Sequence, residues 1–381
     1  MARKLVTVRD IANLRPIPGS PRFQIAEVDG WTCAVKSEEF RVGETVLFFE
    51  IDSFLPSPEV DSRYGREHNP LHNVVVNWQG SKGIHVRSMM VNHSREISQG
   101  VILKVNAFPE FESIYSELVF KLGAHDGNMA WMNMCFAETL GVKKWELPQG
   151  LTGQSLGSLP AFFPKTDLER VQNVKTLFTD KYANAVFQES VKMDGSSMSV
   201  YYVRNNSQFY KSLPVLPANT KAELEHGRVG VCTKNLDLNE FGGSEFWKIA
   251  LKYKLPQKLE NVGLNIAIQG ELVGWKINKN RHQFKEGEYE FYVYSMFNID
   301  NQKYIHPDVT VARAQQLGLK HVPILGKVRI HEIAKNQSDL LKRAEGTDNN
   351  GLKREGLVYK NLEDSRSFKV IANNYLLTHG E

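Results

Sequence analysis

The stretch FQESVKMDGSSMSVYYV, residues 187–203, places a charged residue within an apolar run that is rich in β-forming residues. Lys192 ends one strand-like segment, and Asp194-Gly195 marks a turn before the chain continues as a second strand. A lysine at this place is either a solvated turn residue or a group positioned to do chemistry. Because Asp-Gly is common in turns and lysine is tolerated beside it, the tetrapeptide Lys-Met-Asp-Gly alone does not decide between the two.

Three distant residues share the unusual setting of Lys192. Glu271 lies in IQGELVG, Glu355 in REGLVYK and Lys369 in SFKVIAN. Each is a charged residue within or at the end of an otherwise apolar strand. Because successive side chains of a strand point to opposite faces, a single charged residue on the solvent-facing side of a strand indicates no function. Four such residues in one strand-rich region predict a shared polar cleft.

The first 105 residues or so predict a small β-barrel. FQIAEVDGWTCAVK, residues 23–36, contains two strands around Asp29-Gly30, and RVGETVLFFEIDSFLP, residues 41–56, contains another strand pair around Gly43. GIHVRSMMV and GVILKV add two short strands. Four to six short strands with turn signals in about a hundred residues are typical of an OB-type barrel.

The remainder predicts a linker and a second domain, which makes the fold class α+β. Residues 110–123 and 129–141 have helical periodicity, and the Gly/Ser/Pro-rich segment 148–160 is a connector. Thr166-x-x-Glu169 is a capping box that predicts a helix carrying Arg170 and Gln172. From 182 onward strands alternate with helices, which we expect around 219–226, 243–252, 309–317 and 329–345. The predicted domains are 1–160, the OB-like module with a helical linker segment, and 161–381.

The charged residues, taken in order, resemble the motifs of the covalent nucleotidyltransferase superfamily, which contains polynucleotide ligases and capping enzymes. Lys192 matches the nucleophile of its first motif, and Glu271, Glu355 and Lys369 match the charged residues of later motifs. FFPKTDLERVQN and VCTKNLDL, residues 162–173 and 231–238, resemble ATP-dependent RNA ligases in particular, as do LFFEIDSFLP and REISQGVILKV near the N-terminus. The resemblance implies an RNA ligase with an N-terminal OB domain, followed by a nucleotidyltransferase domain of antiparallel sheets with flanking helices.

This resemblance implies a lysine that attacks ATP. An amine must lose its proton to attack, and the reference pKa of lysine is about 10.4, so burial and a nearby cation have to lower it. Mg²⁺ or Mn²⁺ would supply that cation and neutralise phosphate charge. Hard oxygen ligands suit such ions, often through water. The carboxylates that we expect to serve are Asp194, Glu355 and Glu271.

The resemblance also implies a set of nucleotide contacts. Glu271 has a second plausible role in holding a ribose hydroxyl, and Lys369 is expected to contact the α-phosphate. Tyr294 is the expected adenine platform, with Phe291 or Phe297 as alternatives. The remaining expected contacts are Glu189 near the adenine edge, Arg170 at the ATP phosphates and Asn235 at the ribose. Taken singly, Tyr294 reads as a core residue, and Arg170 as a solvated helix residue.

Two departures from the ligase pattern concern basic residues. Related ligases often carry K-x-K in the last motif, but here Ser367 and Ile371 flank Lys369 at that spacing, which leaves Arg366 as a substitute. In CTKN, Lys234 stands where related RNA ligases usually have arginine, and an amine cannot reproduce a bidentate guanidinium contact. Both departures concern phosphate contacts and leave the predicted class unchanged.

The expected reaction is ATP-dependent joining of RNA 3′-hydroxyl and 5′-phosphate ends through lysyl-AMP and RNA-adenylate intermediates. Capping enzymes and most DNA ligases carry an OB domain after the last motif. Only twelve residues follow Lys369 in this sequence, so we expect neither a capping enzyme nor the usual type of DNA ligase. The alternatives are a ligase of nicked duplexes, including DNA, or a nucleic-acid-binding protein with a degenerate ligase domain.

The bulk composition agrees with an intracellular nucleic-acid enzyme. The 381 residues carry a net charge of +4, a mild indication of a polyanionic partner. Three scattered cysteines without a C-x-x-C pair suit a reducing compartment, the cytoplasm or nucleus. The first ten residues, MARKLVTVRD, lack the apolar stretch of a signal peptide, and no apolar run approaches transmembrane length, so we expect neither a secretory signal nor a membrane span. We expect a monomer that does not bind membranes.

Overall fold

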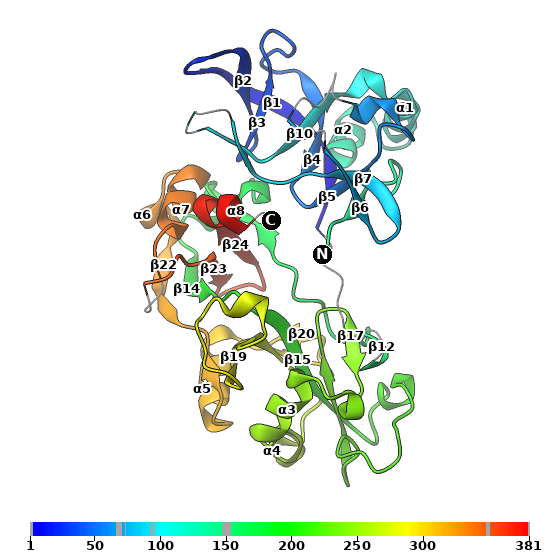
Figure 1. The fold of residues 1–381 in the computed structure, drawn as a ribbon, viewed down its shortest axis with the longest axis vertical. Helices are drawn as coiled ribbons and strands as arrows, with labels where there is room; N and C mark the ends of the chain where they lie inside the picture. Colours follow the sequence, from blue (N-terminus) through cyan, green and yellow to red (C-terminus); the bar gives the residue numbers. More distant parts are fainter. Residues whose placement is uncertain are drawn as a thin grey trace. The chain divides into compact units, whose positions relative to one another are not determined.

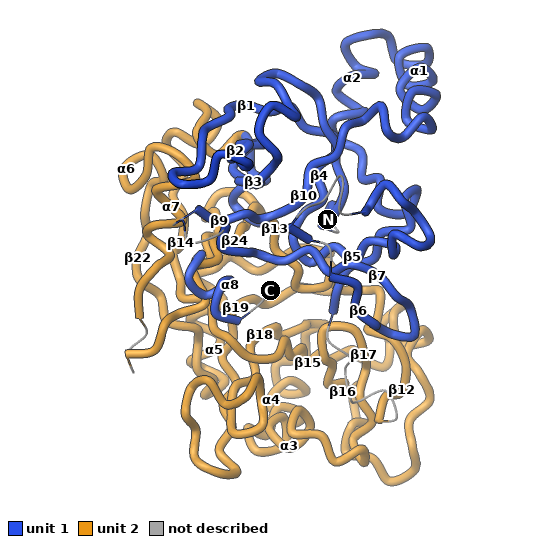
Figure 2. The backbone as a smooth tube through the Cα atoms, turned by 45° about the horizontal axis from the view of Figure 1, so that its top comes forward, with its two compact units in different colours: residues 1–148, 170–175, 373–381 blue, residues 149–169, 176–372 orange. Residues whose placement is uncertain are grey.

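The computed structural model describes residues 3–65, 71, 72, 74–91, 94, 96–146, 154–347 and 351–379. The chain forms two compact units, and neither is one continuous stretch of sequence. Unit 1 contains residues 1–148, 170–175 and 373–381, and unit 2 contains 149–169 and 176–372 (Figure 2). The domain bounds 1–160 and 161–381 stay a prediction. No helix among the described residues is long and apolar enough to cross a membrane.

Unit 1 is built on a curled antiparallel sheet of five strands. Its two edge strands contact each other, so the sheet bends toward a barrel. The longest strand is irregular after Ile11, and it pairs with one neighbour before this point and with another after it. In spatial order the strands are β10 (Gly100–Lys104), β4 (Thr45–Glu50), β1 (Val6–Ile17), β2 (Ser20–Val28) and β3 (Trp31–Lys36).

The hairpin predicted at Asp29-Gly30 is confirmed, because β2 and β3 pair in register on either side of these two residues. Asp29 adopts a left-handed backbone with φ of 52°, as tight hairpin turns require. The strand pair predicted around Gly43 was wrong: residues 41–56 contain two strands, Thr45–Glu50 and Ser53–Pro56, which are separated at Ile51-Asp52 and belong to different sheets. Gly43, with φ of 80°, instead shapes the turn that precedes β4.

A second sheet and a helical hairpin complete the main body of unit 1. The sheet contains β11 (Lys143–Lys144), β5 (Ser53–Pro56), β7 (Ser81–His85) and β6 (Val75–Trp78). The short strands β8 (Met89–Met90) and β9 (Ile97–Ser98) form a separate pair. The helices are α1 (Glu110–Leu122), as predicted, α2 (Ala124–Asn133), which ends earlier than predicted, and α8 (Asn373–His379).

Unit 2 contains an eight-stranded sheet with different surroundings on its two faces. Helices α3 (Glu245–Lys252), α4 (Leu255–Val262) and α5 (Pro307–Gln316) pack on one face over an apolar core (Figure 1). Phe162 and Phe163 pack on the other face. The strands are β12 (Ser155–Ser158), β17 (Leu236–Leu238), β16 (Gly227–Cys232), β15 (Ser196–Arg204), β18 (Ile266–Gly274), β19 (Tyr289–Asn298) and β20 (Lys303–Tyr304), with β21 (Lys320–His321) beside β19.

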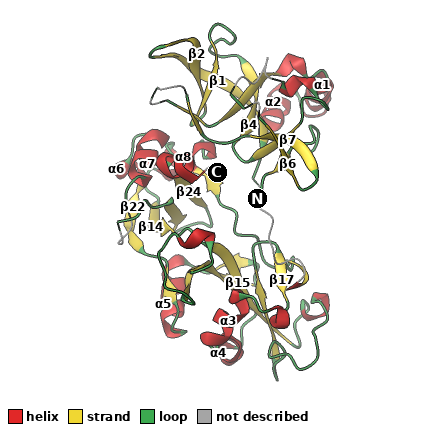
Figure 3. Ribbon diagram, viewed as in Figure 1, coloured by secondary structure: helices red, strands yellow, loops and turns green. Residues whose placement is uncertain are grey.

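A smaller antiparallel sheet of unit 2 carries the other half of the predicted site. It contains β24 (Ser367–Ile371), β23 (Gly356–Asn361), β14 (Val186–Lys192) and β22 (Ile324–Arg329), in this order. The helices of this region are α6 (Ile330–Ile333) and α7 (Gln337–Ala344), and α7 contacts β24. Figure 3 shows how strands predominate over helices in both units. The predicted α+β class with sheet-rich units is confirmed.

Three local predictions were wrong or incomplete. The capping box at Thr166 opens no α-helix, because the chain forms strand β13 (Glu169–Arg170) and a single 3₁₀ turn, Val171–Asn173. Residues 219–226 are also not helical; their turn is held by Glu240, which accepts hydrogen bonds from Thr220 Oγ1 and Lys221 N. The predicted connector contains strand β12, while its residues 148–153 lie outside the described residues.

Candidate active site

The Lys-Met-Asp-Gly turn connects the two sheets of unit 2. Strand β14 of the smaller sheet ends at Lys192, and β15 of the larger sheet begins at Ser196. The turn therefore brings Lys192, on one sheet, next to residues that line the helix-free face of the other. A charge at the end of a buried strand is explained by this position, because the chain leaves one layer there and enters the next.

Lys192 and Glu355 form an ion pair within the smaller sheet. Lys192 pairs with Gly356, the first residue of β23, and Glu355 comes directly before that strand. The distance from Lys192 Nζ to Glu355 Oε1 is 2.6 Å, with 24% of the lysine side chain and 7% of the glutamate side chain exposed. The amine is thus reachable from solvent, while its carboxylate partner is buried.

Gly195 allows the turn to pack against Glu271. A Cβ atom at Gly195 would lie 2.4 Å from the Leu272 carbonyl oxygen and 2.8 Å from Glu271 Cγ, so only glycine fits. Burial raises the pKa of Glu271 to about 8; the Lys192 ammonium opposes this rise, and the negative charges of Glu355 and Asp194 add to it. The three predicted carboxylates and the lysine therefore share one electrostatic site.

Asp194 is held by the loop that follows β18. Asn278 Nδ2 donates to Asp194 Oδ1 at 2.7 Å and to the Gly195 carbonyl at 2.8 Å. The Arg281 guanidinium forms an ion pair with Oδ2 of the same carboxylate. Neither Asn278 nor Arg281 was among the residues selected from the sequence. The signal that could have found them is its run of basic residues shortly after Glu271.

Lys369 and Lys234 meet at one carboxylate that sequence reasoning did not select. Asp167 Oδ1 lies 3.7 Å from Lys369 Nζ, and Asp167 Oδ2 lies 3.4 Å from Lys234 Nζ. Two ammonium groups around one anion form a place where a phosphate could bind in competition with Asp167. The proposed substitute Arg366 lies elsewhere, with its guanidinium 5.3 Å from the ring centre of Tyr182.

Tyr294 occupies an irregular position in β19. Its neighbours Val293 and Ser295 pair with the consecutive residues Gly270 and Gln269, so Tyr294 is an extra residue in this strand. Its hydroxyl lies 3.3 Å from Ser197 Oγ. Burial raises the pKa of the Tyr294 hydroxyl, which therefore stays neutral. The alternatives are packed: Phe291 in the core beneath the helices, and Phe297 edge-on against Tyr304.

Lys360 is a buried lysine on the face that carries Lys192. Along β23 it lies two residues after Val358, which pairs with Lys369, and it pairs with Ser367. Its ammonium donates to the Tyr294 carbonyl and, at 2.7 Å, to Ser295 Oγ. Burial lowers the pKa of Lys360 to about 7. The sequence contained a signal for Lys360: in REGLVYK, this lysine lies near the end of the apolar strand that begins after Glu355.

Glu189 does not join this group. It lies three residues before Lys192 on a regularly paired strand, so the two side chains are on opposite faces. Arg343 donates to both carboxylate oxygens of Glu189, at 2.7 and 2.9 Å, and the Tyr359 hydroxyl donates at 2.6 Å. Burial opposes ionisation, but these hydrogen bonds hold the pKa of Glu189 below its ordinary value. On the Lys192 face, Ser190 and Gln188 precede the lysine.

Two further predicted contacts have partners of their own. Asn235, between β16 and β17, accepts a hydrogen bond from Lys165 Nζ at 2.9 Å. Arg170 belongs to unit 1, where its guanidinium lies 3.3 Å from Asp52 Oδ2 and 3.7 Å from Glu50 Oε1. The expected contacts of Asn235 with ribose and of Arg170 with ATP phosphates stay predictions.

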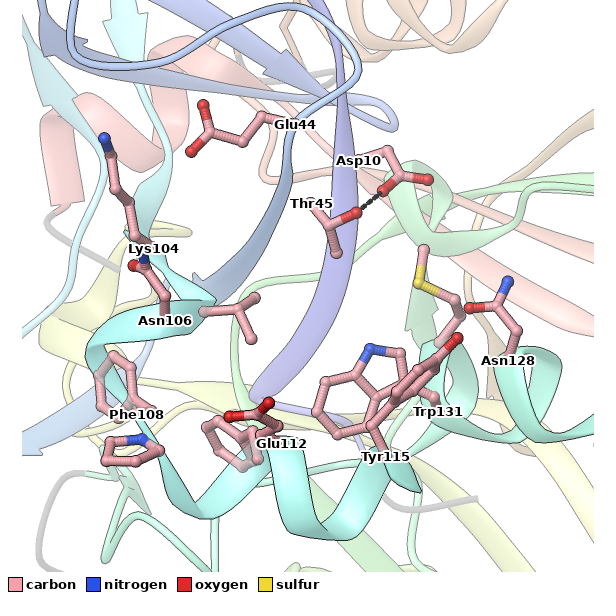
Figure 4. Close-up of a pocket in the computed structure, with 14 residues that line it drawn as sticks. Asp10, Glu44, Thr45, Lys104, Asn106, Phe108, Glu112, Tyr115, Asn128 and Trp131 are labelled. Atoms are coloured by element: carbon pink, nitrogen blue, oxygen red, sulfur yellow. Dashed lines mark hydrogen bonds between the residues drawn. The ribbon is translucent and has the colours of Figure 1, made fainter. Parts of the chain in front are cut away.

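Unit 1 also contains a cavity of about 680 Å³ at the helical hairpin. Tyr115 and Trp131 line it with their rings edge to face, and Thr45 donates a hydrogen bond to Asp10 (Figure 4). None of the residues selected from the sequence lines this cavity. The candidate site is therefore the group around Lys192 in unit 2.

Comparison with known proteins assigns both parts of the chain. A family model described as RNA ligase matches residues 185–371, and an OB-fold domain model matches residues 5–105. These matches confirm the predicted OB-type module and the ligase-type domain that follows it. A search of curated proteins found no match.

Solved structures of Naegleria gruberi RNA ligase are similar along the whole chain. A variant without ligand has 31% identity and a TM-score of 0.81, with 99% of this chain and 98% of that chain covered. A complex with PPi has 31% identity and a TM-score of 0.80, covering 100% and 99%. A variant with ATP and Mn has the same identity and TM-score, covering all of both chains. The chain therefore belongs to the RNA ligase family.

Proposed function

We propose that this chain is an ATP-dependent RNA ligase that joins RNA 3′-hydroxyl and 5′-phosphate ends, with Lys192 as the nucleophile. The observation that carries the proposal is the ion pair of Lys192 with the buried Glu355, in a site that also contains Glu271 and Asp194. A solvated turn lysine would need no such surroundings. Family membership and the ATP-bound structure of a relative support the same assignment.

In the proposed reaction, AMP passes from ATP to the Lys192 amine and then to the RNA 5′-phosphate, before the two RNA ends are joined. The Lys192 amine attacks the α-phosphorus of ATP, a P–N bond forms, and the bond to pyrophosphate breaks. A 5′-phosphate oxygen of RNA then attacks the same phosphorus, which releases the lysine and yields the RNA-adenylate. Finally the 3′-hydroxyl attacks the RNA 5′-phosphorus, and AMP leaves. The proposed role of Lys369, which like Lys234 lies near Asp167, is to stabilise charge on the transferred phosphate.

The residues fit a divalent cation that is held largely through water. Asp194, Glu271 and Glu355 are hard oxygen donors. Burial, and after it the negative charges of Glu355 and Asp194, raise the pKa of Glu271, and a bound cation would oppose this rise. The described residues contain no group of three such side chains that could hold an ion by themselves. When bound, Mg²⁺ or Mn²⁺ would neutralise phosphate charge. Mn in structures of a relative supports this choice.

We propose that adenosine binds on the same face. Tyr294 is the proposed platform for adenine, because its ring belongs to the strand that pairs with Glu271. Asn235 and Arg170 remain the proposed ribose and phosphate contacts. We further propose a monomer in a reducing intracellular compartment, which the free Cys33, Cys135 and Cys232 support.

The test is transfer of label from ATP to protein. Full-length protein with MgCl₂ and α-labelled ATP should become covalently labelled, and Lys192→Ala should abolish the label. Lys303→Ala, at an exposed position of β20, is the matched control and should label normally. Subsequent transfer of AMP to 5′-phosphorylated RNA, and sealing of two RNA strands, should follow.

Four results would contradict parts of the proposal. Label that persists in Lys192→Ala overturns the nucleophile. Labelling by GTP but not ATP overturns the nucleotide. Efficient transfer of AMP to nicked DNA but not to RNA would show that the substrate is a nicked duplex. Absence of any label would indicate a nucleic-acid-binding protein with a degenerate ligase domain.

A further inference from the structure

The loop that follows β18 combines exposed cations with an exposed aromatic ring. Residues 275–283 carry Lys276, Lys279 and Arg281 and contain no carboxylate. Trp275 is 37% exposed, which is unusual for so large an apolar side chain. Both lysines are exposed, and neither is ion-paired within the part of the chain that the structure describes. Cations beside an aromatic ring are the composition of a single-strand nucleic-acid surface.

The backbone of this loop is strained. Asn278, Lys279 and Asn280 have φ values of 41°, 58° and 54°, all in the left-handed region that most side chains avoid. Asparagine tolerates this region, but lysine gains nothing from it. Such strain persists only where surrounding contacts enforce it, and it clusters at functional sites.

Hydrogen bonds to the catalytic turn enforce the loop's conformation. Asn278 donates to Asp194 and to the Gly195 carbonyl, and His282 Nε2 lies 2.9 Å from the Asp194 carbonyl oxygen. Asn280 closes the loop by exchanging two hydrogen bonds of 2.8 Å with Phe284. The exposed lysines are therefore fixed next to the turn that carries Lys192, rather than on an independent surface.

The charge of the loop is divided between two tasks. Arg281 is paired with Asp194, so its charge is used within the site. Lys276 and Lys279 lie on either side of Asn278, outside that pair. A bound polyanion would gain two phosphate contacts from them, and Trp275 would offer a stacking surface for a base. A small nucleotide already held between the sheets would have no need of either.

We propose that residues 275–279 bind the RNA strand whose end is joined, with Lys276 and Lys279 on backbone phosphates and Trp275 stacked on a base. This inference rests on the proposed ligase function and adds the surface that receives the RNA. The proposed RNA surface distinguishes two steps of the reaction, formation of lysyl-AMP and transfer of AMP to RNA. Formation of lysyl-AMP requires only ATP, so it should not depend on these three side chains, whereas transfer to RNA should.

The experiment measures both steps on the same full-length variants. Trp275→Ala, Trp275→Phe and the double variant Lys276→Ala/Lys279→Ala are compared with two controls. These are Phe241→Ala, which removes another exposed ring of unit 2, and Lys303→Ala. One assay is self-labelling with α-labelled ATP. The other is fluorescence anisotropy of 5′-phosphorylated single-stranded RNA, titrated without ATP at several salt concentrations.

The expected results differ between the two assays. Self-labelling should stay within about twofold of wild type for every variant, which also shows that the variants fold. Trp275→Ala should weaken RNA binding roughly 5- to 100-fold, and Trp275→Phe should restore most of it. The double lysine variant should lower the slope of log affinity against log salt by about 1.4, two phosphates at about 0.7 each. The controls should bind RNA as wild type does.

Other outcomes overturn the inference without touching the ligase assignment. Normal labelling together with unchanged RNA affinity and salt slope would show that RNA binds elsewhere. Equal loss of labelling and RNA binding would show that the loop serves the nucleotide site. Equal effects of the loop and control variants on RNA binding would show that RNA responds to general surface charge and not to residues 275–279. By contrast, failure of wild-type protein to label would refute the proposed function itself.

Discussion

Lys192 Nζ lies 2.6 Å from Oε1 of Glu355, although the two residues belong to opposite ends of the domain sequence. The antiparallel pairing of β14 with β23 creates this contact, since Lys192 is the partner of the residue that follows Glu355. The amine is thus engaged by a buried carboxylate. Attack on a phosphate requires the lysine to leave this pair and to lose its proton.

Glu355→Gln is expected to lower the rate of self-labelling with ATP by about 10- to 100-fold, because a neutral amide neither pairs with Lys192 nor holds metal-bound water as a carboxylate does. The measurement is the initial rate of label incorporation at saturating ATP and MgCl₂. Glu363→Gln, at an exposed position after β23, is the matched control. A Glu355→Gln rate equal to that of the control would remove Glu355 from the site.

Gly195→Ala should destabilise the protein by about 1–3 kcal/mol, since the added methyl group would lie 2.4 Å from the Leu272 carbonyl oxygen. The measurement is the urea midpoint together with self-labelling. Gly326→Ala is the control, because nothing lies within 4 Å of a Cβ atom at that glycine of the same unit. Equal midpoints for the two variants would show that the turn can move away from β18 at no cost.

Glu189→Gln should lower the free energy of unfolding by about 1–2 kcal/mol and leave the preference for ATP over GTP unchanged. The reason is that its carboxylate is bonded to Arg343 and Tyr359 on the face opposite Lys192. Arg329→Met, which removes an exposed pair with Glu332, should have little effect on stability. A changed nucleotide preference at unchanged stability would support the adenine contact that the resemblance implied.

Lys360→Met should change how stability depends on pH. Burial lowers the pKa of Lys360 to about 7, while lysine in the unfolded chain keeps a pKa of about 10.4. Between these values the unfolded chain binds the extra proton, so the free energy of unfolding of wild type rises with pH, by up to about 1.4 kcal/mol per unit. The burial cost is present in full below pH 7.

The measurement compares urea unfolding of wild type and Lys360→Met at pH 6, 7, 8 and 9. The difference between the two proteins should shift in favour of wild type as the pH rises above about 7. Lys303→Met, at an exposed site, should run parallel to wild type. Parallel curves for Lys360→Met as well would mean that Lys360 keeps its proton throughout this range.

Much of the architecture follows from local sequence signals. Asp29-Gly30 determines a hairpin because a two-residue turn needs a left-handed backbone, which this pair tolerates. The same reasoning failed at Thr166, whose hydroxyl lies 2.8 Å from Ser197 Oγ instead of capping a helix. A helix cap contributes only a small free energy, and a tertiary hydrogen bond of the same side chain can outweigh it.

The sequence by itself determined which chemical groups the site contains: an amine at Lys192, a carboxylate at Asp194 in the turn that follows it, and carboxylates at Glu271 and Glu355 within or next to apolar strands. Only the tertiary structure decided their neighbours. Asp167 between two lysines, Lys360 beneath Tyr294, and Arg281 on Asp194 are contacts between segments far apart in sequence. Strand register and sheet pairing create such contacts, and both are set by long-range packing rather than by the local order of residues.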